Sequence, residues 1–191
     1  MMSDTKNILL VGVGGQGIIL VSKILTAGLM KAGYDVKMSE VHGMAQRGGS
    51  VTTQVRFGKK VYSPIIGRGQ ADILVSFEKM EAARWVEYLK PEGKVVVNNY
   101  EIPSLPIASG KAEYPQGVIE ALQKVFATTV LDAGKAAEEV GNIKTQNIVL
   151  LGALVKALGL NEIDWVEILK ENLPQKMVDI NIKAFNKGME L

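Results

Sequence analysis

The chain has 191 residues, of which 47% are hydrophobic and 22% are charged, a composition typical of globular proteins and not of disordered ones. Twenty-two Lys and Arg against 20 Asp and Glu leave a net charge of +2, too small to indicate nucleic-acid binding by the whole molecule. The lack of cysteine excludes disulfides, cysteine-bound iron–sulfur clusters and thiol nucleophiles in this chain, and a single histidine, His42, excludes a multi-histidine metal site.

The N-terminal part predicts a strand–helix–strand unit followed by a hairpin. The apolar run 7–12 ends in glycines and predicts a buried strand, residues 15–31 predict a helix, and residues 34–40 alternate apolar and polar side chains as a strand does. Such a unit favours a parallel sheet. Residues 50–62 are rich in β-forming side chains around a connection at 57–60, which predicts an inserted hairpin.

The remainder continues the alternation of strands and helices and then becomes helical. We expect strands at 71–77, 94–99 and 128–133, and helices at 78–89, 118–125, 135–140, 145–158, 164–173 and 175–189. A turn at 91–93 should separate the helix 78–89 from the next strand, and the last helix should pack against the sheet through Val178, Ile182, Phe185 and Met189. The predicted fold is one Rossmann-like three-layer α/β domain over 1–191, with a mostly parallel sheet, an inserted hairpin and a helical C-terminal tail.

Neither the N-terminal segment nor the most apolar stretch of the sequence gives a signal for secretion or membrane insertion. MMSDTKN leads directly into apolar residues without the charged and cleavable segments of a signal peptide, and the most apolar stretch, 148–158, is shorter than the ~18 to 20 residues of a membrane span. We therefore expect a cytoplasmic protein without membrane contact.

A glycine motif lies between the first strand and the first helix. It satisfies the pattern G-x-G-x-x-G, whose glycines let the backbone approach a ligand and whose helix N-terminus attracts phosphate. The acidic residue expected for ribose binding is Glu40, although it lies farther along than the usual ~20 residues. Close packing of strand and helix explains the glycines equally well. The candidate phosphate-binding residues are Gly12, Gly14, Gly15, Gln16 and Gly17.

The loop after the second predicted strand is the other candidate site. No carboxylate occurs from 41 to 71, whereas this segment carries five positive charges: Arg47, Arg56, Lys59, Lys60 and Arg68. Such a local patch suits an anionic ligand or an acidic partner surface, although Lys59 and Lys60 could equally be ordinary solvated side chains. The candidate contacts with a partner or an anion are His42, Gln46, Arg47, Gly48 and Gly49.

Four segments together resemble one protein family, the gamma-type subunits of 2-oxoacid:ferredoxin oxidoreductases. They are LLVGVGGQGIILVSKIL (9–25), SEVHGMAQRGGSV (39–51), ADILVSFEKMEAAR (71–84) and TQNIVLLGAL (145–154), and the resemblance spans nearly the whole chain. HGMAQRGG is most similar to the small (beta) subunit of indolepyruvate:ferredoxin oxidoreductase, because an acidic residue commonly precedes RGG in the pyruvate and 2-oxoglutarate versions.

The resemblance implies a role in oxidative decarboxylation. An aryl 2-oxoacid, coenzyme A and oxidised ferredoxin would give an aryl-acetyl-CoA, carbon dioxide and reduced ferredoxin. In the family, thiamine diphosphate and iron–sulfur clusters belong to a large partner subunit. This chain has neither cysteine nor the G-D-G…N-N thiamine motif, and Asn98-Asn99 is expected to be only a strand-to-loop turn.

The resemblance and the composition together predict a subunit that holds no cofactor and no metal. Its partners would be the large subunit and, through the complex, ferredoxin, and the isolated chain should be inactive. The sequence also allows a homo-oligomer of the isolated chain. Two alternatives stay open: a stand-alone NAD(P)-binding oxidoreductase and a free-standing interaction module.

Overall fold

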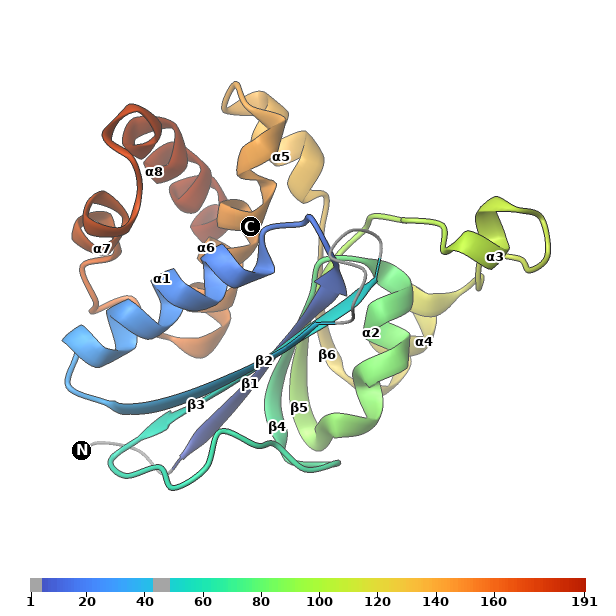
Figure 1. Cartoon of the computed structure of the whole chain (residues 1–191), viewed down its shortest axis with the longest axis horizontal. Helices are drawn as coiled ribbons and strands as arrows, with labels where there is room; N and C mark the ends of the chain where they lie inside the picture. Colours follow the sequence, from blue (N-terminus) through green and yellow to red (C-terminus); the bar gives the residue numbers. More distant parts are fainter. Residues whose placement is uncertain (1–4, 43–48) are drawn as a thin grey trace.

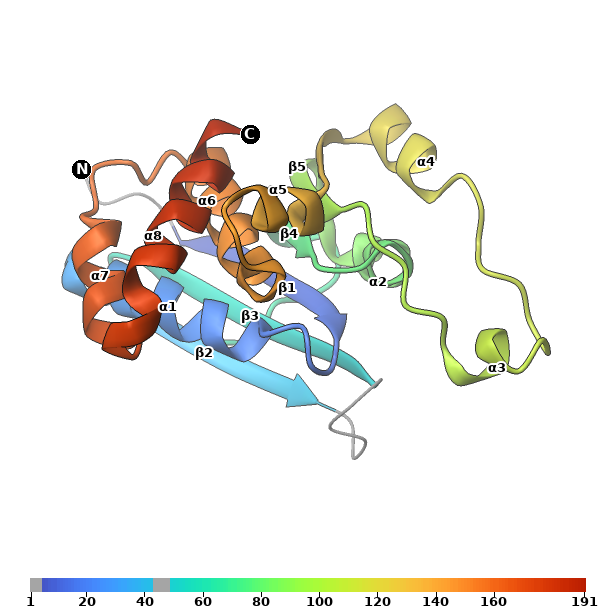
Figure 2. The same cartoon turned by 90° about the horizontal axis from the view of Figure 1, so that it is seen from above.

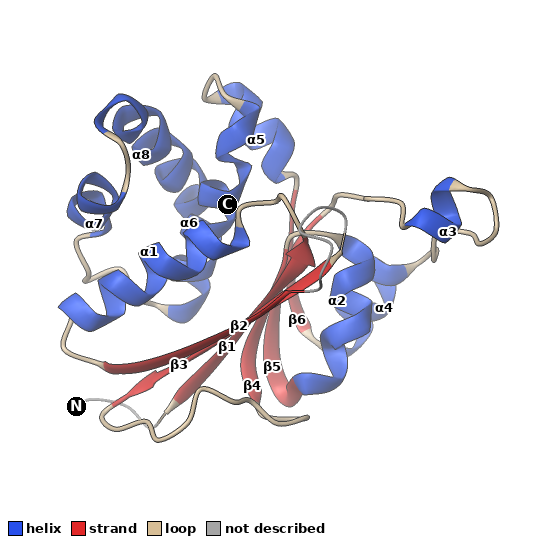
Figure 3. Cartoon of the chain, viewed as in Figure 1, coloured by secondary structure: helices blue, strands red, loops and turns tan. Residues whose placement is uncertain are grey.

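The computed structural model describes residues 5–42 and 49–191, and within them the chain forms a six-stranded sheet with helices on both faces (Figures 1 and 3). The strand order is β2-β3-β1-β4-β5-β6, and β3 runs in the direction opposite to the other strands. The mostly parallel sheet and the α/β class are therefore confirmed. The strands are β1 (Lys6–Val13), β2 (Asp35–His42), β3 (Ser50–Gly58), β4 (Ala71–Ser76), β5 (Leu89–Asn98) and β6 (Ala127–Leu131).

The hairpin predicted within residues 50–62 is wrong. Residues 50–58 form the single strand β3, which pairs with β2 on one side and with β1 on the other. Pairing with β2 places Val55 beside Met38 and Phe57 beside Val36 on one apolar face. A return strand at 59–62 would have begun with two lysines, and Gly58 instead ends the strand. Consequently β3 lies between β1 and β2.

The helices form two layers (Figures 1 and 2). One face of the sheet is covered by α1 (Ile18–Lys31), α5 (Ala133–Glu139), α6 (Gln146–Leu158), α7 (Trp165–Asn172) and α8 (Gln175–Glu190), with a 3-10 turn at Ile143–Thr145. The other face carries α2 (Lys79–Trp85) and α4 (Val118–Val125), while α3 (Leu105–Ala108) projects away from the body of the molecule. Separate apolar cores lie on the two faces. No helix within the described ranges is both long and apolar enough to cross a bilayer.

The boundary between α2 and β5 differs from the prediction. The helix ends at Trp85, a 3-10 turn follows at Val86–Tyr88, and β5 already begins at Leu89. The ladder with β4 is interrupted between Leu89 and Lys94, so the expected turn at 91–93 is an irregularity inside the strand. A proline cannot donate to a ladder, and this explains why the interruption includes Pro91.

The C-terminal helix packs on another helix, so its predicted contact with the sheet is wrong. α6 is buried on nearly all sides, with β5 beneath it and α8 above it. Gly152 of α6 and Gly188 of α8 allow the two backbones to touch: a Cβ atom added to Gly188 would lie 2.0 Å from the carbonyl oxygen of Val149. Val178 and Phe185 are buried, as their helical spacing predicted.

Candidate functional site

The glycine turn connects β1 to α1 at the carboxyl edge of the parallel strands. Gly15 and Gly17 adopt positive φ angles of 102° and 78°, a conformation that favours glycine. Gly12 and Gly17 also permit close packing. A Cβ atom on Gly12 would lie 2.8 Å from Phe77 Cβ, and one on Gly17 would lie 2.4 Å from Asn147 Nδ2. Packing therefore accounts for these two glycines.

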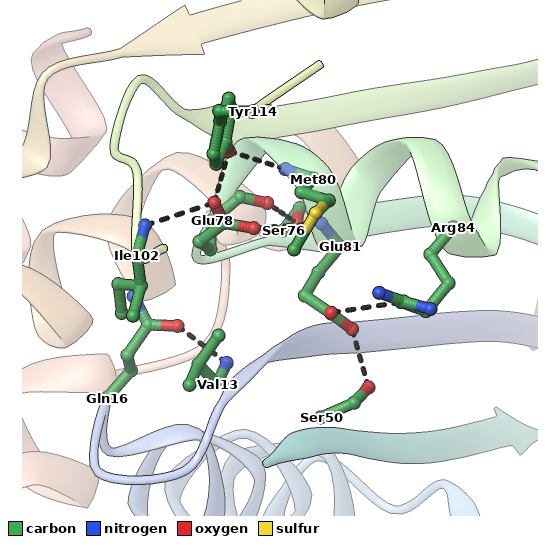
Figure 4. A network of polar contacts seen from close by, with 10 residues as sticks. All are labelled: Val13, Gln16, Ser50, Ser76, Glu78, Met80, Glu81, Arg84, Ile102 and Tyr114. Atoms are coloured by element: carbon green, nitrogen blue, oxygen red, sulfur yellow. Dashed lines mark hydrogen bonds and ion pairs between the residues drawn. The ribbon is translucent and has the colours of Figure 1, made fainter. Parts of the chain in front are cut away.

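Hydrogen bonds within the chain close this turn. The amide of Val13 donates to Gln16 Oε1 at 2.8 Å (Figure 4). Gln16 Nε2 in turn donates to the carbonyl of Phe77 at 2.8 Å. The amide of Gly14 donates to the carbonyl of Gly49 at 2.8 Å. The turn thus uses several donors that a phosphate would otherwise take, and it lies directly against the end of the second candidate segment.

The second candidate segment is described only at its two ends. The backbone of His42 ends β2 opposite Val51, and Gly49 contacts the glycine turn. The candidates Gln46, Arg47 and Gly48 lie outside the described residues. The two candidate segments therefore meet at the same edge of the sheet.

A hollow of about 290 Å³ opens beside the glycine turn. It is lined by residues 13–19 and by Val51, so its wall consists of glycine backbone and apolar side chains. We call it the glycine hollow. Ile19 at its rim is 37% exposed. The hollow suits an apolar or backbone contact better than a strongly charged one.

Glu40 does not occupy the position of a ribose-binding carboxylate. In a dinucleotide-binding βαβ unit the second strand lies next to the first, whereas here β3 separates β2 from β1. Two strand spacings place Glu40 roughly 10 Å to the side of β1. Its Oε1 instead accepts a hydrogen bond from Ser22 of α1 at 3.3 Å. The alternative of a nicotinamide-binding enzyme therefore lacks the acidic residue that would bind the ribose.

The positive charges of segment 41–71 that the structure describes lie away from the carboxyl edge, so the prediction that this segment forms one surface beside the glycine turn is wrong for Arg56, Lys59, Lys60 and Arg68. β3 carries the chain from Ser50 at the carboxyl edge to Gly58 at the opposite edge, about 26 Å away for eight residue steps. Beyond Gly58, the chain at that amino edge carries Lys59, Lys60 and Arg68. Arg47 lies outside the described residues.

The described arginines of this segment also have partners inside the chain. Arg56 donates from Nε to Asn7 Oδ1 at 2.8 Å and from Nη1 to the carbonyl of Ser63 at 2.9 Å. Arg68 lies 3.2 Å from Glu87. The two arginines thus find an amide partner, Asn7, and a carboxylate partner, Glu87, outside the segment, which its local composition could not reveal.

Two buried carboxylates stand at the carboxyl edge, where β4 leads into α2 (Figure 4). Glu78 is fully buried and caps α2: its Oε2 accepts from the amide of Glu81 at 2.9 Å. Glu81 is 3% exposed, and its carboxylate accepts from Ser50 Oγ at 2.5 Å and from Arg84 Nε at 3.1 Å. Glu81 therefore anchors the first residue of β3.

The other oxygen of Glu78 holds the long connection between β5 and α4. Glu78 Oε1 accepts from the amide of Ile102 at 3.2 Å and from the hydroxyl of Tyr114 (Figure 4). The Tyr114 oxygen also accepts from the amide of Met80 at 3.0 Å. Burial, followed by the hydrogen bond to the Glu78 carboxylate, raises the pKa of Tyr114 well above its usual range.

Comparisons with known proteins match nearly the whole length of the chain. The family model "Pyruvate ferredoxin/flavodoxin oxidoreductase" covers residues 7–191. The chain belongs to this family. The chain is 41% identical over 192 residues to "Indolepyruvate oxidoreductase subunit IorB" of Thermococcus kodakarensis, covering 96% of this chain and 94% of the relative. It is 29% identical over 201 residues to "2-oxoglutarate synthase subunit KorC" of Methanothermobacter thermautotrophicus, covering 100% and 97%.

A solved structure has the same fold as this member of the oxidoreductase family. The gamma subunit of a keto/oxoacid ferredoxin oxidoreductase from Geobacter sulfurreducens aligns with a TM-score of 0.71 at 25% identity, covering 97% of this chain and 96% of that one. The resemblance to the gamma-type subunits is confirmed, and the chain is a small subunit of the 2-oxoacid:ferredoxin oxidoreductase type. These comparisons lend no support to a stand-alone nicotinamide enzyme.

The polar groups at the carboxyl edge of this oxidoreductase subunit serve to position its chain. Gln16, Glu78 and Glu81 are each satisfied by partners in the chain, and Asn98, expected to be only a turn, joins Phe77 to the start of α5 through its buried amide. Within the described residues, no cluster of three or more His, Asp or Glu side chains could hold a metal ion.

The sequence contained a signal for the two carboxylates that the prediction did not use. Glu78 and Glu81 follow a buried strand directly and stand three residues apart, the spacing of a helix cap and the third residue of the helix. Polar residues at the carboxyl end of a parallel strand mark the functional edge of this fold class. The prediction treated EKMEAAR only as the start of a helix.

Tyr114 should make the stability of the protein fall as the pH rises above about 10. An unfolded chain ionises tyrosine near pH 10, whereas the folded chain keeps Tyr114 protonated. The unfolded state therefore binds fewer protons above that pH, and its free energy falls relative to that of the folded state. We expect the difference in Tm between wild type and Tyr114→Phe to be largest at pH 8 and to shrink towards pH 11. Parallel Tm curves for the two proteins would contradict the Tyr114–Glu78 contact.

Proposed function

We propose that this chain is the small subunit of an indolepyruvate:ferredoxin oxidoreductase. The observation that carries the proposal is the 41% identity to an indolepyruvate oxidoreductase subunit over nearly the whole length of both chains, against 29% for a 2-oxoglutarate synthase subunit. The segment HGMAQRGG favours the same subgroup. The reaction would convert an aryl 2-oxoacid, coenzyme A and oxidised ferredoxin into the aryl-acetyl-CoA, carbon dioxide and reduced ferredoxin.

In this proposal the cofactors belong to a large partner subunit. Thiamine diphosphate supplies the carbanion chemistry and iron–sulfur clusters carry the electrons to ferredoxin. A chain without cysteine cannot ligate such clusters through thiolates, and it has no thiamine motif. Its own residues therefore assemble and position the complex in the cytoplasm, and coenzyme A acts as co-substrate of the assembled enzyme.

The carboxyl edge is the proposed contact with that large subunit or with the anionic part of coenzyme A. The glycine turn, Gly49 and the glycine hollow lie together there, and the loop from His42 to Gly49 leaves from the same edge. The proposed contacts are His42, Gln46, Arg47, Gly48 and Gly49, and the amides of the glycine turn that remain available could add donors for a phosphate.

Two measurements on the isolated chain separate this proposal from the nicotinamide alternative. We expect no reduction of a viologen dye by the chain alone with indolepyruvate and coenzyme A, and no heat of binding in a calorimetric titration with NADH. The reasons are the missing thiamine motif and the displaced Glu40. Turnover by the chain alone, or micromolar affinity for NADH, would contradict the proposal.

A further inference from the structure

The connection between β5 and α4 leaves the body of the molecule at the carboxyl edge (Figures 1 and 2). It spans residues 99–117, far more than the ~2 to 6 residues usual between a strand and the next helix of an α/β unit. Its central part, residues 102–114, carries the short helix α3, of which no residue is buried. We call residues 102–114 the arm. A long connection that adds nothing to the core is usually either functional or a disordered linker.

The tip of the arm is apolar and exposed. Leu105 is 83% exposed, and no charged residue occurs from Ile102 to Gly110. Pro103 and Pro106 fix two backbone torsions in this stretch, which reduces the conformational freedom lost on binding. These properties are typical of a preorganised apolar anchor and not of a solvated loop.

The arm is held in place by a clamp on the first turn of α2. Both ends of the arm reach the same oxygen of the buried Glu78 carboxylate, through the amide of Ile102 at 3.2 Å and the hydroxyl of Tyr114 (Figure 4). Just before the arm, the amide of Lys79 donates to the carbonyl of Tyr100 at 3.0 Å. A buried carboxylate therefore orders a segment that core packing does not hold.

We propose that the arm is an interaction surface that inserts Leu105 into an apolar groove of the large partner subunit, and that Glu78 is the positioning residue that holds the arm ready. This inference rests on the proposed function. The arm leaves the same edge of the sheet as the glycine turn and the glycine hollow, so both can meet one partner. Buried apolar anchors of this kind carry much of the binding free energy at interfaces.

A second copy of this chain fits the arm less well. Two arms in contact would bury little more than this short segment on each side, well below the roughly 1,000 Å² of a stable interface. The two hollows at the opposite edge of the sheet are bordered by charged side chains, among them Lys94 and Glu162. These charged hollows do not suit an uncharged leucine tip, and insertion of Leu105 into the apolar glycine hollow of a second copy is the alternative that sedimentation tests.

The test measures binding of the purified large subunit to the chain and to two matched variants. Leu105→Asp changes an 83% exposed side chain on the arm, and Tyr62→Asp changes an 88% exposed side chain at the opposite edge. Neither side chain supports the core, so both variants should fold. We expect Leu105→Asp to raise the dissociation constant at least about 30-fold and Tyr62→Asp to leave it within twofold.

A third variant tests the clamp. Tyr114→Phe removes one of the two bonds that join the arm to Glu78, so we expect faster amide hydrogen exchange in residues 103–113 and about 3- to 10-fold weaker binding. Leu105→Asp should weaken binding without faster exchange. Unchanged exchange in Tyr114→Phe would overturn the positioning role of Glu78.

The possible outcomes distinguish a failure of the arm proposal from a failure of the proposed function. Failure of the wild-type chain to bind the large subunit would reject the proposed function itself. If the wild type binds and Leu105→Asp binds equally well, or no more weakly than Tyr62→Asp, the arm proposal alone is overturned. It is also overturned if Leu105→Asp abolishes only self-association of the chain in sedimentation.

Discussion

Replacing Gly188 by alanine should destabilise the protein by about 3 kcal/mol or more and lower its Tm by roughly 6 to 12 °C. The added Cβ atom would lie 2.0 Å from the carbonyl oxygen of Val149 and 2.8 Å from its carbonyl carbon. These are backbone atoms of α6, which is itself fixed against the sheet, so the clash can be relieved only by separating α6 from α8. Thermal or urea unfolding of the purified chain measures the loss.

Gly134→Ala is the matched control. This glycine lies in α5, and the nearest atom to an added Cβ would be the Ile143 Cδ1 atom at 3.5 Å, an ordinary contact. Alanine is the better helix former, so the change should be neutral or stabilise by up to about 1 kcal/mol. Equal stabilities of Gly188→Ala and Gly134→Ala would contradict the close packing of α6 on α8.

Replacing Arg47 by alanine should weaken the complex with the large subunit by about 2 to 5 kcal/mol, a 30-fold to several-thousand-fold rise in dissociation constant. A guanidinium followed by two glycines can approach a carboxylate or phosphate closely and bind it through two hydrogen bonds. The ends of its loop lie beside the glycine turn at the carboxyl edge. Co-expression of the variant with the large subunit, followed by measurement of complex recovery and activity, checks the expectation.

Lys60→Ala serves as the comparison for Arg47→Ala. Lys60 follows β3 at the opposite edge of the sheet, where its ammonium group lies 4.0 Å from Asp35 and its side chain is 67% exposed. An exposed ion pair of this kind contributes about 1 kcal/mol or less, so complex recovery should stay close to wild type. Wild-type behaviour of both folded variants would show that the loop is only a turn and that docking occurs elsewhere.

Local patterns were sufficient to predict most of the strands and helices but not their partners. The apolar run of β1 and the alternation of β2 and β3 specify strands by themselves. Which strand pairs with which depends on the apolar face that Val55 and Phe57 share with Val36 and Met38, a long-range property. For the same reason the last helix was assigned to the sheet, although Gly152 and Gly188 bring it onto α6.

The candidate site shows the same division between local and long-range information. The glycine turn was visible because its residues are consecutive, and its place at the edge of the sheet follows from the strand before it. The clamp joins Glu78 to Tyr114, 36 residues away, and no local spacing marks such a pair. Likewise, Asn7 and Glu87, which pair with Arg56 and Arg68, come from other segments, so the charge pattern of 41–71 alone overestimated the basic patch.

The most direct test of the account is reconstitution of the reaction from the two separately purified subunits. We expect coenzyme A-dependent reduction of ferredoxin with indolepyruvate when this chain and the large subunit are combined, little or none with either subunit alone, and lower rates with pyruvate or 2-oxoglutarate. The expectation follows from the family membership of the chain and from its lack of cysteine. Full activity of the large subunit without this chain would contradict the account.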